Sequence, residues 1–142
     1  MRKKLLFTFM LGLVALTTWG QRGVKDVSPV APVPSPQQVE WQKMETYAFI
    51  HFGLNTFNDK EWGYGNSDVK TFNPKKLDCE QWARVLSTAG MKGVIITAKH
   101  HDGFCLWPTH TTDYCIRNSP YKNGNGDIVG ELSKACKKYG LK

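Results

Sequence analysis

The sequence predicts an α/β fold made of two βα units, the first two units of a (β/α)8 TIM-like barrel. Two short apolar stretches are each followed by a long polar loop and then by an amphipathic helix. Ionisable residues cluster directly after these stretches, where a parallel barrel carries its active site. A doubly wound sheet is disfavoured because residues 53–56, the turn after the first stretch, have no phosphate-binding glycine pattern.

The N-terminal residues predict export. Residues 1–20 have the layout of a secretory signal peptide, in which a basic start at residues 2–4 precedes an uncharged apolar run at residues 5–16. The run is too short to predict a membrane span. A Pro-rich, extended leader is predicted over residues 21–38, and the folded domain over residues 39–142. We expect a periplasmic or extracellular bacterial protein with no membrane partner after signal removal.

Charge and cysteine spacing exclude several classes. The formal net charge is +7, but the basic residues are scattered and form no patch for nucleic acid. None of the four cysteines forms a C-x-x-C pair, so no zinc or redox motif is predicted. Cys79 and Cys136 fall in predicted helices, where a buried thiol is a common small apolar side chain. No disulfide pairing is predicted.

The first βα unit begins with a short apolar run. Residues 47–52 predict a buried parallel strand that ends at Gly53. After the loop, Asp78 and Gln81 have the spacing of a helix N-cap and its partner. The apolar residues that follow lie at helical spacing, and Gly90 ends the predicted helix.

The second unit repeats this order. Residues 93–97 predict the second strand, and a second helix is expected from Asp127 to Gly140. Gly130 lowers the helix propensity inside it. Since the first helix exit leads directly into a strand, we expect a third strand within a residue or two of Lys142. The chain is therefore expected to be an N-terminal piece, because a complete barrel needs about 250 residues.

Candidate functional residues follow both strands. His51 ends the first strand, Glu61 and Trp62 lie in the first loop, and His100 and His101 follow the second strand. Parallel strands place their carboxyl ends at one face of a barrel, so these side chains are expected to converge. Their neighbours Asp102, Tyr64, Phe104 and Trp107 extend the mixed wall. Imidazole, carboxylate and indole groups together suit a sugar, since polar groups bind its hydroxyls and aromatic rings cover its C–H faces.

Metal binding is the competing interpretation. His51, His100, His101 and Asp102 are chemically suitable ligands. However, adjacent residues of an extended chain point in opposite directions, so His100 and His101 are not expected to meet one ion. We therefore predict neither a metal site nor a cofactor.

Several motifs resemble one enzyme family. The motif F-I-H-F-G at residues 49–53, E-W-G at 61–63 and K-H-H-D-G-F-C-L-W-P at 99–108 closely resemble the α-L-fucosidases of glycoside hydrolase family 29. The stretch 127–132 is also similar to that family. The resemblance covers residues 39–142, and K-H-H-D-G-F is its most specific part.

The resemblance implies a catalytic barrel followed by a β-sandwich, and retaining hydrolysis of terminal α-L-fucose from a fucosylated glycan. His51, Glu61, Trp62, His100 and His101 are expected to contact the fucose. Retention requires two carboxyl groups about 5 Å apart. The resemblance places the nucleophile, an aspartate near the end of the fourth strand, and the acid/base beyond this chain. No catalytic residue is therefore expected here, and the chain is expected to be inactive alone.

Two other functions remain open from the sequence. One is a sugar-binding remnant that retains half of the fucose subsite without chemistry. The other is a metal-dependent hydrolase built on a TIM-like barrel.

Overall fold

The computed structural model describes residues 26–142, so the predicted signal peptide at residues 1–20 lies outside the described residues. Residues up to Ser35 form one unit, of which the described part, residues 26–35, is exposed and has no helix or strand. Residues 36–142 form a second unit that contains the described helices and strands. Among the described residues, no helix is long and apolar enough to cross a membrane.

Helix α2 (Pro36–Gln42) opens the second unit, where the sequence predicts the end of an extended leader. The prediction is wrong for residues 36–38, which are helical. Pro36 is tolerated because it is the first helical residue, where a missing N–H removes no helical hydrogen bond. No residue of α2 is buried, and the ring of Trp41 lies 4.8 Å from that of Tyr47.

Strands β1 (Tyr47–Ile50) and β2 (Gly93–Ile96) pair in parallel, as predicted, with Tyr47 opposite Gly93 and Ile50 opposite Ile96. β1 is shorter than the predicted 47–52 because the backbone of Phe52 is hydrogen-bonded to a side chain and not to the backbone of β2. The hydroxyl of Thr97 accepts from the N–H of Phe52 at 3.1 Å and donates to its carbonyl at 3.0 Å. This side chain fastens the ends of the two strands together.

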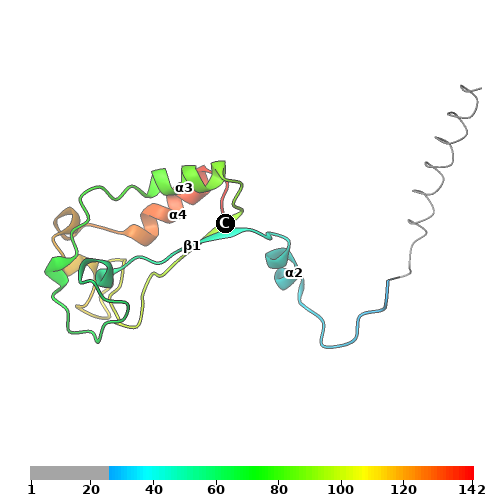
Figure 1. Cartoon of the computed structure of the whole chain (residues 1–142), viewed down its shortest axis with the longest axis horizontal. Helices are drawn as coiled ribbons and strands as arrows, with labels where there is room; N and C mark the ends of the chain where they lie inside the picture. Colours follow the sequence, from blue (N-terminus) through cyan, green and yellow to red (C-terminus); the bar gives the residue numbers. More distant parts are fainter. Residues whose placement is uncertain (1–25) are drawn as a thin grey trace, which may run out of the picture. The chain divides into compact units, whose positions relative to one another are not determined.

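One face of β1 is open, which the sequence did not predict. Tyr47 and Phe49 are 42% and 61% exposed, whereas Ala48 and Ile50 are half-buried. Helices α3 (Cys79–Thr88) and α4 (Ile128–Lys138) lie side by side and pack against one face of the strands (Figure 1). Within the described residues, no second layer covers the face that carries Tyr47 and Phe49.

Both helices begin at the predicted aspartates. The carboxylate of Asp78 accepts from the N–H of Gln81 at 3.0 Å, and that of Asp127 accepts from Gly130 at 2.9 Å. A side chain on Gly130 would place its Cβ 2.3 Å from the Asp127 carboxylate. The glycine that weakens the helix prediction therefore makes room for the helix cap.

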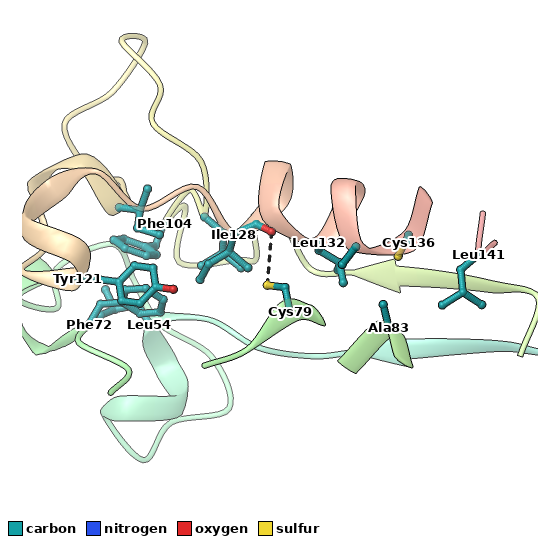
Figure 2. Close-up of a cluster of buried hydrophobic side chains, with 13 residues drawn as sticks. Leu54, Phe72, Cys79, Ala83, Phe104, Tyr121, Ile128, Leu132, Cys136 and Leu141 are labelled. Atoms are coloured by element: carbon teal, nitrogen blue, oxygen red, sulfur yellow. Dashed lines mark hydrogen bonds between the residues drawn. The ribbon is translucent and has the colours of Figure 1, made fainter. Parts of the chain in front are cut away.

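The core lies between these helices and the loops. Figure 2 shows the thiol of Cys79 directed at the carbonyl of Ile128, to which it donates a hydrogen bond at 3.9 Å. At the loop end, the ring of Phe72 lies 5.0 Å from Phe104 and 6.0 Å from Tyr121. All four cysteines are buried free thiols, which confirms the prediction for Cys79 and Cys136.

Lys142, which follows α4 and its turn, is hydrogen-bonded to β2. The N–H of Lys142 donates to the carbonyl of Lys92 at 3.0 Å, and the N–H of Val94 donates to the carbonyl of Lys142 at 2.8 Å. This is the hydrogen-bond pattern of a parallel ladder. It lies on the edge of β2 away from β1, where the sequence predicts a third strand.

Four short 3-10 helices shape the two long loops. They span Leu54–Phe57, Val69–Thr71, Ile116–Asn118 and Tyr121–Gly124. The first of them follows β1 directly and places Leu54 and Asn55 in the interior, beneath the candidate site.

Candidate functional site

His51 is held at the end of β1 by the bonds on either side of it. The carbonyl of Ile50 accepts from the N–H of Thr97 at 3.1 Å, and the next residue, Phe52, is bonded to the Thr97 hydroxyl. By strand alternation His51 shares the open face of β1 with Phe49, and their rings are 6.2 Å apart. The imidazole of His51 is exposed, and its ring lies 4.5 Å from that of His100, which follows β2.

His100 and His101 lie in a tight turn after β2. Lys99 pairs in an antiparallel bridge with Cys105, and the N–H of Gly103 donates to the carbonyl of His100 at 3.0 Å. Gly103 has a φ of +83°, which a glycine adopts readily. The two imidazole rings are 4.6 Å apart. The rings approach each other because the backbone turns here and is not extended.

Glu61 and Trp62 reach the site from the first loop. Trp62 is 63% exposed, and its ring lies 5.8 Å from that of His101. The adjacent Gly63 is buried, and a Cβ there would lie 2.6 Å from Oδ1 of Asn55 and 2.8 Å from Cβ of Asp102. The loop therefore approaches its neighbours so closely that only a glycine fits.

Three of these side chains line a cavity of about 200 Å³. His51, Glu61 and His100 line it, while Trp62 and His101 join it through their ring contacts. All five residues singled out in the sequence thus come together. The predicted convergence of groups from two strand ends is present in the structure.

Below the imidazoles lies a buried polar layer. Asn55 is 8% exposed and Asp102 is 5% exposed, and both line the cavity. Oδ1 of Asn55, Oδ2 of Asp102 and Nδ1 of His100 are buried and have no hydrogen-bond partner among residues 26–142. The other oxygen of Asp102 accepts from the N–H of Phe104 at 3.3 Å.

Sequence reasoning noticed Asp102 as part of a polar cluster but missed Asn55. Nothing in the stretch 53–58 distinguishes Asn55 from an ordinary loop asparagine, because its burial depends on contact with Gly63 and on the nearby 3-10 helix. The signal is long-range and not local.

The expected aromatic wall is smaller than predicted. Phe104 is 2% exposed and belongs to the core, although it also lines the cavity. Tyr64 is 89% exposed and is not among the residues that line the cavity. Trp62 does not line the cavity either, but its ring contact with His101 connects it to the site.

The buried Asp102 carboxylate affects its surroundings. Burial, followed by the negative charge of Asp102, raises the pKa of Tyr114 above its ordinary value. Burial likewise raises the pKa of Cys105, with smaller contributions from nearby charges. Among the described residues, no three His, Cys, Asp or Glu side chains are grouped so that they could hold a metal ion.

The arrangement favours binding of a small polyhydroxy ligand. Imidazole nitrogens and the Glu61 carboxylate offer donors and acceptors to hydroxyl groups, and the Trp62 ring offers an apolar face. Glu61 and Asp102 are the carboxylates that line the cavity. Asp102 is buried and bonded to backbone, which suits it to a supporting role.

Comparison with known proteins identifies close relatives. The family model described as alpha-L-fucosidase matches residues 17–142. Alpha-L-fucosidase 1 of Arabidopsis thaliana is 49% identical over 113 residues, which are 80% of this chain and 22% of the relative.

Solved structures of the same family are also similar to this chain. A glycoside hydrolase 29 family member from an unknown rumen bacterium is 60% identical, with a TM-score of 0.77 over 81% of this chain and 21% of its own. A Ruminococcus gnavus family 29 fucosidase mutant in complex with fucose is 42% identical, with a TM-score of 0.71 over 84% of this chain and 25% of its own. The chain thus spans about a fifth to a quarter of the length of these relatives.

Proposed function

Because the chain belongs to the α-L-fucosidase family, we propose that it serves the retaining hydrolysis of terminal α-L-fucose from glycans. The observation that carries this proposal is that His51, Glu61 and His100 line one cavity. Ring contacts join His101 to His100 and Trp62 to His101. These five residues are proposed to bind the fucose unit.

Each residue type has a plausible partner on the sugar. Imidazole and carboxylate groups bind the hydroxyls of a sugar ring in fixed directions. The rings of His51 and His100 lie 4.5 Å apart, so both can contact the same sugar. The exposed ring of Trp62 covers the apolar C–H face and the methyl group of a 6-deoxy sugar. Fucose therefore has partners for both kinds of surface, the polar cavity wall and the exposed ring of Trp62.

The bond-breaking groups are proposed to come from outside residues 1–142. Retaining hydrolysis uses a nucleophile and an acid/base about 5 Å apart. Asp102 is buried beneath the imidazoles, and Glu61 is assigned to sugar binding. We therefore propose that the 142-residue chain binds fucose without turnover and that the catalytic carboxylates belong to later barrel strands.

The proposed scaffold is a (β/α)8 barrel whose first two units are residues 39–142. It is supported by the parallel β1–β2 pair, by α3 and α4 packing on one face of the strands, and by the pairing of Lys142 with the outer edge of β2. Export to the periplasm or the cell exterior is proposed from the signal-like residues 1–20. Mass spectrometry of the mature N-terminus tests that proposal.

The test is hydrolysis of an aryl α-L-fucoside by the protein that carries this segment with the rest of its barrel. We expect release of α-L-fucose as the first product, seen by NMR, and a fall in kcat/KM of about 100-fold or more for His100→Ala. His110→Ala, an exposed histidine outside the cavity, is the control. Inactivity on α-L-fucosides combined with activity on another glycoside would contradict the proposal.

Two arms separate the alternatives. Exhaustive chelation should leave the rate unchanged, and loss of activity that a divalent metal restores would favour the metal-dependent hydrolase. Calorimetric titration of the 142-residue chain with L-fucose, combined with turnover assays of the longer protein, separates the enzyme from the sugar-binding remnant. Binding without turnover in both the chain and the longer protein would favour the remnant over the enzyme.

A further inference from the structure

Three unpartnered, buried polar atoms belong to residues that line the same cavity. Oδ1 of Asn55 and Oδ2 of Asp102 are acceptors, whereas Nδ1 of His100 is a donor or an acceptor according to its tautomer. An unsatisfied buried polar atom costs about 1–3 kcal/mol, so three together call for a shared partner.

The fold brings the three residues close together. Oδ1 of Asn55 and Cβ of Asp102 both border the position that a side chain on Gly63 would take, at 2.6 Å and 2.8 Å. Asp102 and His100 are two residues apart in a turn closed by the Gly103–His100 hydrogen bond.

We propose that Asn55, Asp102 and His100 bind one buried water molecule beneath the sugar site. The water accepts a hydrogen bond from Nδ1–H of His100 and donates one to Oδ2 of Asp102 and one to Oδ1 of Asn55. A water molecule has two hydrogens to donate and lone pairs to accept, which matches two acceptors and one donor. A sugar hydroxyl has a single hydrogen and satisfies only one of the two oxygens.

The water fixes the tautomer of His100. With its proton on Nδ1, the neutral imidazole carries a lone pair on Nε2, which accepts a hydrogen bond from a sugar hydroxyl. Asp102 is then a positioning residue, since it acts on the ligand through the water and His100. This inference concerns the site of the proposed function, but the protonation of His100 can be measured without any sugar.

The experiment is a two-bond ¹H–¹⁵N NMR spectrum of the 142-residue chain labelled with ¹⁵N-histidine. The chain has four histidines, and single His→Gln variants assign them. At about pH 8, above the ordinary imidazole pKa of about 6.5, the ring nitrogens report the neutral tautomer. We expect His100 in the Nδ1–H form and the exposed His110 mostly in the Nε2–H form, as in free histidine. A His100 in the Nε2–H form overturns the proposal.

Asp102→Asn tests the positioning role. The variant keeps the size of the side chain, but it loses the carboxylate charge and offers an N–H₂ group in place of an acceptor. We expect the ratio of Nδ1–H to Nε2–H in His100 to fall by about tenfold, while the exposed Asp113→Asn leaves it unchanged. Asn55→Leu, which also removes an acceptor, gives a second reading if Asp102→Asn does not fold. An unchanged ratio in a folded variant overturns the role.

A cation is the competing occupant. Oxygen ligands from Asn55 and Asp102 with a nitrogen from His100 would need the Nδ1 lone pair, and hence the Nε2–H tautomer. Spectra recorded with a chelator and with added Ca²⁺ separate the cases. Identical His100 signals in both support the water, and a change on chelation or Ca²⁺ addition overturns it. Since no sugar is present, failure here leaves the fucosidase proposal standing.

Discussion

At the scale of single residues, Gly63 sets the position of the sugar-binding loop. Gly63→Ala forces a methyl group against Asn55 Oδ1 and Asp102 Cβ, at 2.6 and 2.8 Å, so the loop that carries Glu61 and Trp62 must move outward. Such overpacking costs about 1–3 kcal/mol of stability. We expect the dissociation constant for L-fucose to rise about tenfold or more, equivalent to about 1.4 kcal/mol for each factor of ten.

Calorimetry with L-fucose, together with a thermal melt, measures both effects. Asn66→Ala, an exposed position in the same loop, is the control and should change neither value. Equal affinities for Gly63→Ala and the unaltered chain would show that the loop position does not govern sugar binding.

The buried thiol of Cys79 should make the stability of the chain depend on pH in alkaline solution. Burial raises its pKa from the ordinary 9.0 to about 11, with a smaller contribution from the Glu131 charge. Because the folded state holds this proton more tightly, the stabilisation is fully present below about pH 9 and is lost as the pH rises towards 11. Denaturant unfolding at pH 8, 9, 10 and 11 should therefore show a falling free energy of unfolding.

Cys79→Ser identifies the group responsible for this pH dependence. Its hydroxyl does not ionise in the range, so the slope of stability against pH should be smaller than in the unaltered chain. Part of the slope remains because burial also raises the pKa of Cys105 and Cys136. An identical slope in both proteins would contradict the assignment.

At the scale of elements, Gly130 shows how a helix cap overrides helix propensity. Alanine inside a helix is ordinarily favoured over glycine by about 1 kcal/mol. Here its Cβ would meet the Asp127 carboxylate at 2.3 Å and displace a cap that contributes about 1 kcal/mol. We expect Gly130→Ala to leave the melting temperature of the chain unchanged or lower it, and Ser133→Ala, exposed on the same helix, to raise it slightly.

A double-mutant cycle makes the cause explicit. In an Asp127→Ala background the cap is already gone, so Gly130→Ala should then stabilise α4 by about 1 kcal/mol. Stabilisation of the same size with Asp127 present would show that the carboxylate does not restrict residue 130.

The same elements show what sequence patterns can predict. The caps at Asp78 and Asp127, both strands and the glycine exits depend on residues a few positions apart, so local patterns predicted them. Helix α2 was missed because the prolines before it favour extended chain, although Pro36 is suited to a first helical position.

In the site, too, local patterns predict some features, whereas others depend on contacts between distant residues. His51 and the residues of the K-H-H-D-G-F motif could be predicted because they follow strands directly. The 4.6 Å approach of the His100 and His101 rings and the burial of Asn55 depend on a turn and on contact with Gly63, which no short spacing encodes. The burial of β1 was overestimated because it depends on a second layer of structure.

At the scale of the whole molecule, the open face of β1 predicts self-association of the 142-residue chain. Phe49 and Tyr47 leave apolar surface exposed beside a strand edge that pairs with no other described strand. We expect the mass measured by sedimentation equilibrium to rise with concentration. Phe49→Lys should reduce that rise, since a charge on the face opposes burial.

Val27→Lys is the matched control, because Val27 is also apolar and 89% exposed but lies in the leader. It adds the same charge to a residue that is not part of β1 and should leave the association unchanged. A chain that stays monomeric at all concentrations, or an equal effect of both variants, would contradict the role of the β1 face.

The central claim is that groups from two strand ends form one fucose site, and a crystal structure of the protein that carries this segment, with L-fucose bound, tests it most directly. The account predicts a sugar whose hydroxyls contact His51, Glu61, His100 and His101 and whose apolar face lies against Trp62. Fucose bound at a distance from these five residues would contradict the account.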